Sequence, residues 1–288
     1  MTNFLTDRTQ SVRYRNKIAR AEQTSIKTIN TGAPQGTVIS PFLFTLYTND
    51  CTAHSQEASI IKFSDDTAII DTSDSHTSYE REVEQFAGWC DRHGLDLNVG
   101  MTKEMVVDLK SEKKKSTVNA CMIKGQEVER VNVYKYLGTT IDSKLSFKQN
   151  TDEVFRKCRQ RLHILYTLRA LKVNKTIMER CYQSFIQSVL AFSMICWFGS
   201  LGVREKTKLN SIVRTCEKII GSKQQTIEEI FRKRATKRVI GIQKDPTHVL
   251  AHLLKTLPSG RRLQNFKCRL KRFEKTFIPQ SIKLFNSR

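Results

Sequence analysis

The pattern of apolar and polar positions changes near residue 146. Before that point, short apolar runs alternate with polar turns, which is typical of strands and hairpins. Ile60–Lys62 and Ala68–Ile70 flank the polar step Ser64-Asp65-Asp66 and predict two strands joined by a tight turn. Val118–Ile123 and Gln126–Val131, on either side of Lys124-Gly125, predict another hairpin.

The remaining elements of this first part follow from spacing and from stop signals. Apolar residues at intervals of three and four predict a helix from Ser78 to His93, ended by Gly94. Ser40-Pro41 is expected to start a helix with proline at its first position. Strands are expected at Met105–Leu109 and at Val133–Ile141.

From Ser146 onward the apolar period is helical. Ser222–Gln225 is expected to be a linker, and 258–276 a basic loop or arm with Phe266 and Phe273 interleaved, which suits backbone or single-strand binding but equally an anchor of the tail. The helices expected in this part are Phe147–Leu171, Lys175–Cys196, Arg204–Ile220 (ended by Gly221), Thr226–Gly241 and Thr247–Leu257.

Charge is distributed unevenly over the 288 residues. Residues 1–110 contain 11 Lys/Arg and 15 Asp/Glu, a net charge of −4, whereas residues 111–288 contain 38 and 13, a net charge of +25. An excess of one sign on one segment is the electrostatic signature of a polyanionic partner. The basic part is therefore expected to hold nucleic acid through phosphate contacts.

Other chemistry is not indicated. Eight cysteines occur without a Cys-x-x-Cys pair, which argues against a zinc ribbon and a disulfide framework. His248 and His252 are spaced to share one helix face, but a closed zinc site needs four ligands. No signal-peptide core opens the chain, and the apolar stretch Val189–Phe198 is too short for a bilayer span, so an intracellular protein with no membrane partner is expected.

Asp65-Asp66 is the main candidate for chemistry. A hairpin lifts both carboxylates to its tip, where they can bind a divalent cation that phosphate also holds. Taken alone, an Asp-Asp step is more often a plain turn, and the Gly-punctuated stretch Thr31–Phe44 is more often a loop before a helix.

Together, Thr31–Phe44 (with Gly32-Ala33-Pro34-Gln35-Gly36) and Phe63-Ser64-Asp65-Asp66 resemble the polymerase palm of reverse transcriptases of non-LTR (LINE-type, jockey-like, fish-type) retrotransposons. The resemblance implies an RNA-directed DNA polymerase that acts in the nucleus and cytoplasm by two-metal nucleotidyl transfer, with Mg²⁺ or Mn²⁺. It assigns the catalytic, metal-binding role to Asp65 and Asp66, and contact with template and nucleotide to Gly32, Pro34, Gln35 and Gly36.

Further motifs follow in the family's order. Gly94–Asn98 and Thr102–Asp108, with Lys103 near the nucleotide, look like the next palm motif. Tyr134–Ile141 looks like the primer-grip hairpin, centred on Tyr136, Leu137 and Gly138. Three later segments resemble the thumb and tail: Cys196–Gly199, Pro258–Arg262 and Phe277–Gln280. The basic residues expected on the nucleic-acid backbone are Arg156, Arg159, Arg261, Arg262, Lys271 and Arg272.

The expected fold is thus α+β: a partial palm with an antiparallel sheet and flanking helices (1–142), an all-helical thumb (143–221) and a basic helical C-terminal region (222–288). The partners implied are an RNA template, a DNA primer and an incoming dNTP.

Two departures from the family pattern bear on activity. The family's third metal-binding carboxylate, on a strand before the Gly-Ala-Pro-Gln-Gly loop, has no counterpart here, and neither do the fingers and endonuclease portions. Met101 stands where the family usually has lysine near the leaving pyrophosphate. We therefore expect a C-terminal piece of a LINE-type reverse transcriptase that is weak or inactive alone.

Three alternatives remain. The chain could be a non-catalytic nucleic-acid-binding remnant in which the Asp65-Asp66 hairpin is a relic. Residues 147–170 resemble a short stretch of AlkB-type tRNA-modification enzymes, although no histidine stands in a His-x-Asp or His-x-Glu step, as an iron dioxygenase would need. A purely structural protein would explain neither the charge nor the ordered motifs.

Overall fold

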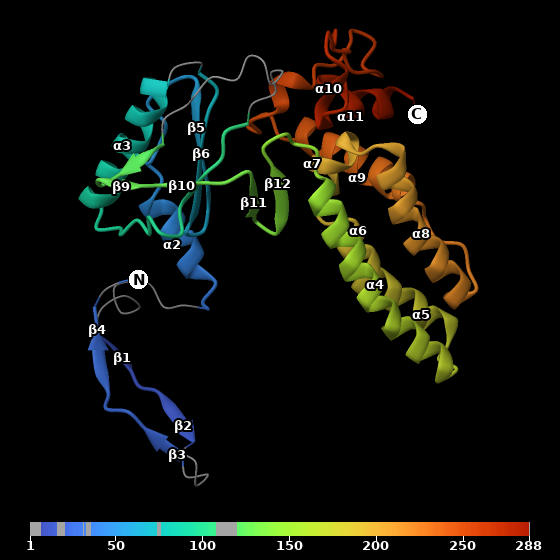
Figure 1. Cartoon of the computed structure of the whole chain (residues 1–288), viewed down its shortest axis with the longest axis horizontal. Coiled ribbons are helices and arrows are strands. Elements are labelled where there is room, and N and C mark those ends of the chain that lie inside the picture. Colours follow the sequence, from blue (N-terminus) through green and yellow to red (C-terminus); the bar gives the residue numbers. More distant parts are fainter. Residues whose placement is uncertain are drawn as a thin grey trace. The chain divides into compact units, whose positions relative to one another are not determined.

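The computed structural model describes residues 7–15, 21–30, 32, 36–73, 76–107 and 120–287. The chain divides into two compact units, an N-terminal unit (Met1–Thr102 with Thr117–Glu129) and a C-terminal unit (Lys103–Ser116 with Arg130–Arg288). Helices and short strands occur in both, so the expected mixed α and β class is confirmed (Figure 1). Within the described residues every sheet is a two-stranded ladder.

Within the described residues, the N-terminal unit holds four antiparallel ladders and two helices. The ladder that matters for the site is β5–β6, in which Ala58 pairs with Asp71 and Phe63 with Asp66. The strand pairs of the N-terminal unit are β1 (Arg8–Gln10) with β4 (Lys27–Ile29), β2 (Arg13–Arg15) with β3 (Ala21–Gln23), β5 (Ala58–Phe63) with β6 (Asp66–Asp71), and β8 (Met122–Ile123) with β9 (Gln126–Glu127). Its helices are α2 (Ile39–Tyr47) and α3 (His76–Arg92).

Helix α3 supplies much of the core of the N-terminal unit. Val83 and Ala87 of α3 pack against Cys121, Ile123 and Val128, while Trp89 and Cys90 pack against Cys51. The predicted end of α3 is confirmed, because Gly94 has a φ of +61°, the left-handed conformation that terminates helices. The predicted Lys124-Gly125 turn is also confirmed, with φ values of +50° and +76°.

Three sequence expectations in the first half need correction. Helix α2 begins at Ile39, so Pro41 is its third residue, and none of its residues is buried. The strand expected at Met105–Leu109 is instead the two-residue β7 (Lys103–Glu104), which pairs with β10 (Glu129–Arg130); residues 108–109 lie outside the described part. The single strand that alternation predicted at Val133–Ile141 is instead a hairpin, as the resemblance to the primer-grip hairpin implied, and Leu137 and Gly138 reverse the chain with positive φ.

The C-terminal unit is mainly helical. Its longest helix, α4, packs along α8, and α9 packs against α11 (Figure 1). Besides β7 and β10, its elements are β11 (Val133–Tyr136), β12 (Thr139–Asp142), α4 (Lys148–Ala170), α5 (Lys175–Cys181), the π-helix η2 (Tyr182–Gln187), α6 (Ser188–Leu190), α7 (Met194–Trp197), the 3₁₀ turn η3 (Phe198–Ser200), α8 (Val203–Ile220), α9 (Ile227–Gln243), the 3₁₀ turn η4 (Ala251–Leu253), α10 (Lys271–Glu274) and α11 (Phe277–Asn286).

The apolar side chains of α4, α8 and the segment between them meet in the main core of this unit, and Val239, Ile242 and Ile282 of α9 and α11 belong to a second cluster. Leu165 of α4 and Leu209 of α8 are almost wholly buried in the main core, as are Tyr182, Leu190 and Trp197 of the segment between them. By length and composition Lys175–Ser200 could span a membrane. Its buried side chains, such as Ile186 and Met194, belong to this core, whereas Phe185 and Phe192 are about half exposed. Burial raises the pKa of the Cys158 and Cys216 thiols to about 12, so both stay protonated at neutral pH.

Two helical predictions in this unit were too simple. Lys175–Cys196 is interrupted by the π-helix η2 and by a turn in which Ser193 has a φ of +47°. Thr247–Leu257 forms only the short η4, and side chains accept hydrogen bonds from two backbone N–H groups just before it. The Asp245 carboxylate accepts from the Thr247 N–H (3.0 Å), and His248 Nδ1 accepts from the Leu250 N–H (3.1 Å).

Asp142 holds the junction between β12 and α4. Its carboxylate accepts hydrogen bonds from the Ser146 N–H (3.0 Å) and the Phe147 N–H (2.7 Å), and Phe147 has a strained φ of +55°. Burial alone would raise the pKa of Asp142, but these hydrogen bonds outweigh it and lower that pKa. A lowered pKa means that Asp142 stabilises the fold above its unfolded-state pKa and loses this effect as the pH falls through its folded-state pKa.

We therefore expect Asp142→Asn to lower the free energy of unfolding at pH 7 by about 1–2 kcal/mol, because an amide nitrogen cannot accept from the Phe147 N–H. The difference from wild type should shrink as the pH falls below about 4. Urea unfolding from pH 3 to 7 measures this, with Glu127→Gln, a change at an exposed carboxylate, as control. A difference that does not change with pH would contradict the assigned role of the charge.

Candidate functional site

The predicted catalytic carboxylates lie at the tip of the β5–β6 hairpin. Ser64 and Asp65 form the turn, with Ser64 at a φ of +54°, and Asp66 is the first residue of β6, paired with Phe63. Both aspartates are exposed, and within the described residues neither makes an ion pair. The hairpin therefore presents two adjacent, uncommitted carboxylates to solvent.

Lys62 anchors this hairpin to the segment after α2. Its ammonium donates to the carbonyl oxygens of Thr48 and Cys51, the latter at 3.0 Å. Both carbonyls follow the C-terminal end of α2, where a positive charge is favoured by the helix dipole. The contact fixes β5 two residues before the turn that carries Asp65.

The glycine-punctuated loop is described only at its margins. Gly32 and Gly36 have φ values of +67° and +79°, conformations that glycine adopts without strain. Thr37 and Ser40 share a hydroxyl hydrogen bond of 2.6 Å at the start of α2. Pro34 and Gln35, predicted to contact template and nucleotide, lie outside the described residues.

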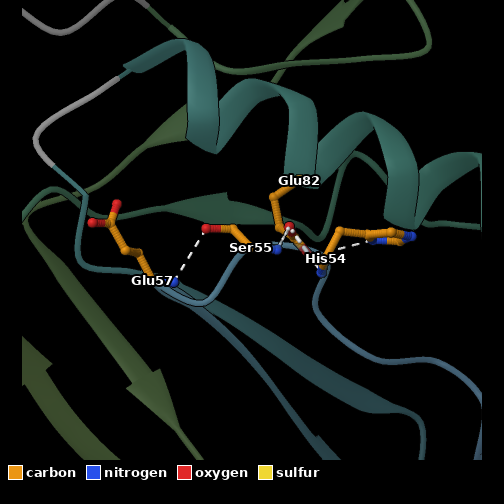
Figure 2. Close-up of polar contacts among 4 residues, drawn as sticks. All are labelled: His54, Ser55, Glu57 and Glu82. Carbon is orange, nitrogen blue, oxygen red and sulfur yellow. Dashed lines mark hydrogen bonds and ion pairs between the residues drawn. The ribbon is translucent and has the colours of Figure 1, made fainter.

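A buried carboxylate that sequence reasoning missed braces the loop leading into β5. Glu82 of α3 is only 2% exposed. Its oxygens accept from the backbone N–H of His54 (3.0 and 3.2 Å) and of Ser55 (3.2 Å), while the His54 ring lies 3.8 Å away, as Figure 2 shows. The Ser55 hydroxyl in turn accepts from the Glu57 N–H. Glu82 thus orders the entry to the acidic hairpin from a neighbouring helix.

We expect Glu82→Gln to destabilise this loop by about 1–3 kcal/mol, because the amide nitrogen of glutamine cannot accept the Ser55 N–H. Hydrogen exchange should show faster exchange at the amides of His54 and Ser55. Glu84→Gln, an exposed change on the same helix, is the matched control. Unchanged exchange at both amides would contradict the brace.

The segment expected near the nucleotide contains a strong internal ion pair. Glu104 is 5% exposed and its Oε2 accepts from Arg130 Nη2 and Nε, each at 2.7 Å. The β7–β10 contact adds a hydrogen bond from the Val131 N–H to the Glu104 carbonyl (2.8 Å). Lys103 precedes this pair on β7. Met101, by contrast, is 72% exposed and offers no charge.

The primer-grip-like residues form the turn of β11–β12. Tyr136 ends β11, and Leu137 and Gly138 form the turn, with φ values of +44° and +83°. A Cβ on Gly138 would lie 3.1 Å from the ring of the half-exposed Phe192, so the turn packs closely against that side chain.

α4 holds the same hairpin from its other side. Asn150 Oδ1 accepts from the Thr140 N–H (3.2 Å), and Glu153 Oε1 accepts from the Thr140 hydroxyl (2.9 Å). Lys135 of β11 pairs with Glu153 at 3.6 Å. These contacts fix the β11–β12 hairpin on α4 and so set the position of the turn relative to the basic residues of α4.

All six predicted backbone-binding residues are exposed. Arg156 and Arg159 lie on α4, Arg261 and Arg262 in the turn 258–262, and Lys271 and Arg272 on α10. Within the described residues none of the five arginines has an ion-pair partner. Their charge is thus open to an external anion.

The ring pairs on this surface show which aromatics are available. Phe266 and Phe273 contact each other edge to face at 6.3 Å and remain 37% and 46% exposed. The guanidinium of Arg159 and the ammonium of Lys208 both lie near the Phe155 ring, at 5.9 and 4.7 Å. Nothing in the sequence indicated these contacts of Phe155. The buried Glu82, by contrast, could have been noticed in the sequence, because it interrupts the apolar stripe that contains Tyr79 and Val83.

Comparison with known proteins gives one family. Residues 1–141 match the reverse transcriptase (RNA-dependent DNA polymerase) family. The RNA-directed DNA polymerase from mobile element jockey of Drosophila melanogaster is 24% identical over 211 residues, which cover 69% of this chain and 23% of that protein. The probable RNA-directed DNA polymerase from transposon BS of the same species is 26% identical over 226 residues, covering 74% and 24%.

A third relative, the probable RNA-directed DNA polymerase from transposon X-element of Drosophila melanogaster, is 23% identical over 176 residues, covering 58% of this chain and 18% of that protein. The chain spans about a quarter of the length of the first two relatives. No solved structure matches the chain.

Proposed function

We propose that this chain, which matches the reverse transcriptase family through residues 1–141 and resembles the polymerases of LINE-type retrotransposons, is part of a longer polymerase that works by two-metal nucleotidyl transfer. The observation that carries the proposal is the pair of exposed carboxylates, Asp65 and Asp66, at a hairpin tip within the matched residues. The protein is proposed to act inside the cell.

The donor set of the hairpin fits a divalent cation. Mg²⁺ and Mn²⁺ prefer carboxylate oxygens, and Mg²⁺ commonly takes one or two carboxylates, keeps several waters and is completed by substrate phosphates. Asp65 and Asp66 would supply those carboxylates, and the bound ion would neutralise the charge that develops on the transferring phosphoryl group. The hairpin's part is to hold both oxygens in place through the Lys62 anchor.

A second feature supports low activity of the chain by itself. In the part of the chain that the structure describes, no group of three His, Cys, Asp or Glu residues is placed to hold a metal ion. Two ions clamped roughly 3.5–4 Å apart need more carboxylate than one Asp-Asp step supplies. Met101 also offers no cation for the leaving pyrophosphate.

The basic C-terminal unit would hold the RNA template and the DNA primer. Arg156 and Arg159 lie on α4, which also contacts the β11–β12 hairpin that contains the primer-grip-like turn. Phosphate contacts of exposed arginines give affinity without sequence preference. Gly32, Pro34, Gln35, Gly36 and Lys103 are proposed to contact template and incoming dNTP.

Primer extension tests the proposal directly. With an RNA template, a DNA primer, dNTPs and Mg²⁺, the isolated chain should bind the primer–template with an affinity that falls steeply as salt rises, yet extend it poorly. A failure to bind primer–template at low salt would refute the polymerase assignment. Robust DNA synthesis would refute the claim of low activity while leaving the assignment intact.

A further inference from the structure

One end of the C-terminal unit contains a hollow of about 270 Å³, far more than the roughly 10–15 Å³ that one water needs. It lies where α4 ends, α5 begins and α8 ends. Its lining is Arg169, Lys172, Val173, Lys175, Met178, Lys218, Ile219, Ile220 and Gly221. None of these residues belongs to the polymerase motifs described above.

Four of the lining side chains are cationic and exposed: Arg169, Lys172, Lys175 and Lys218. Arg169 Nη1 donates to the Lys218 carbonyl at 2.9 Å, which ties the end of α4 to the end of α8. Buried side chains such as Met178 and Ile219 form an apolar floor. Four like charges around one hollow repel each other, so the arrangement is stabilised by a bound anion.

The nearby carboxylates are occupied elsewhere. Glu179 accepts from the Ser222 hydroxyl at 2.7 Å, and Glu217 accepts from the Gln224 N–H at 2.9 Å, so both are engaged by the loop after α8. Within the described residues none of the four cations has an ion-pair partner. The hollow therefore keeps a local positive charge that no neighbouring acid neutralises through a direct contact.

We propose that this hollow, the tip pocket (Arg169, Lys172, Lys175 and Lys218), binds consecutive phosphate groups of a single nucleic-acid strand. A ligand with several closely spaced negative charges matches four cations better than one isolated anion does. A strand backbone supplies such charges continuously, because every nucleotide carries one phosphate.

The pocket is separate from the primer-grip-like turn. α4 contacts β12 near Asn150 and reaches the pocket near Arg169, a rise of about 30 Å at 1.5 Å per residue. The tip pocket would thus hold nucleic acid at a second point, about 30 Å along α4 from the hairpin. This goes beyond the proposed polymerase role, which does not depend on it.

Fluorescence anisotropy of a labelled single-stranded RNA 20-mer across a KCl series tests the pocket. The variant Lys172→Gln/Lys175→Gln/Lys218→Gln keeps the Arg169 tie to the Lys218 carbonyl. The matched control, Lys233→Gln/Lys237→Gln/Lys244→Gln, removes the same charge from exposed positions of α9 and its C-cap. Single-strand contacts contribute about 0.7 each to the slope of log Kobs against log[salt].

We expect the pocket variant to lower that slope by about 2 and the control by much less. Equal losses in both variants, or none in the pocket variant, would overturn the proposal, because bulk charge would then explain binding. Inorganic tripolyphosphate separates the two phosphate sources: if it raises the thermal midpoint of wild type but not of the pocket variant, while both bind RNA equally, the pocket serves free polyphosphate and the proposal fails. Should the triple variant unfold early, the single changes Lys172→Gln and Lys175→Gln decide, each with an expected slope loss of about 0.7.

Discussion

Replacing Asp65 and Asp66 together with asparagine is expected to weaken Mn²⁺ binding to this chain by at least about tenfold, because the only two adjacent carboxylates at the β5–β6 tip lose their charge. A divalent ion gains twice the Coulomb attraction of a monovalent one from each carboxylate. Any residual primer extension should be lost with it. Titration followed by the electron paramagnetic resonance signal of free Mn²⁺ measures the affinity.

A charge-matched variant makes the result interpretable. Glu84→Gln/Asp91→Asn removes two exposed carboxylates of α3 that are not adjacent, so it should leave the affinity for Mn²⁺ near the wild-type value. If the Asp65/Asp66 variant binds Mn²⁺ as tightly as wild type, the hairpin is an ordinary turn. The chain would then be a nucleic-acid-binding protein without a metal site at this position.

Gly199→Ala is expected to cause the largest loss of stability, about 3 kcal/mol in the free energy of unfolding. A Cβ at this position would lie 2.0 Å from the Lys275 carbonyl oxygen, which is backbone and cannot rotate away. The Gln280 side chain lies 3.0 Å from the same point. The turn at the end of α7 must therefore separate from the segment that leads into α11.

Gly241→Ala is the matched control, since a Cβ there meets open space on helix α9. It should stabilise the protein by about 0.5–1 kcal/mol, because alanine loses less backbone entropy in a helix than glycine does. Urea unfolding of both variants gives the comparison. A Gly199→Ala protein as stable as wild type would show that the chain does not approach itself closely here.

The segment Cys196–Gly199, which ends at Gly199, has a packing role in the structure. Cys196–Gly199 is similar to a thumb motif of LINE polymerases, and the structure adds a packing reason for its residues. Trp197 is completely buried and its Nε1 donates to the Phe192 carbonyl at 3.0 Å. The Phe192 ring in turn contacts the turn at Gly138. Trp197 therefore helps to position the side chain against which the primer-grip-like hairpin packs.

The sequence by itself determined the features whose cause is local. Gly94 and Gly221 end α3 and α8 in the left-handed conformation, and Lys124-Gly125 makes the β8–β9 turn, because a few neighbouring residues decide these conformations. The acidic hairpin followed for the same reason, from two apolar runs around a polar step.

Only the tertiary structure decided features in which distant residues meet. The apolar alternation of Val133–Ile141 predicted one strand, but the chain reverses at Leu137 and rests on Phe192. Burial of Glu82, and the cluster of Arg169, Lys175 and Lys218 around one hollow, depend on residues far apart in the sequence. Periodicity shows that a side chain faces a core or solvent, but not which neighbours it meets there, because those contacts arise only when helices and strands pack together.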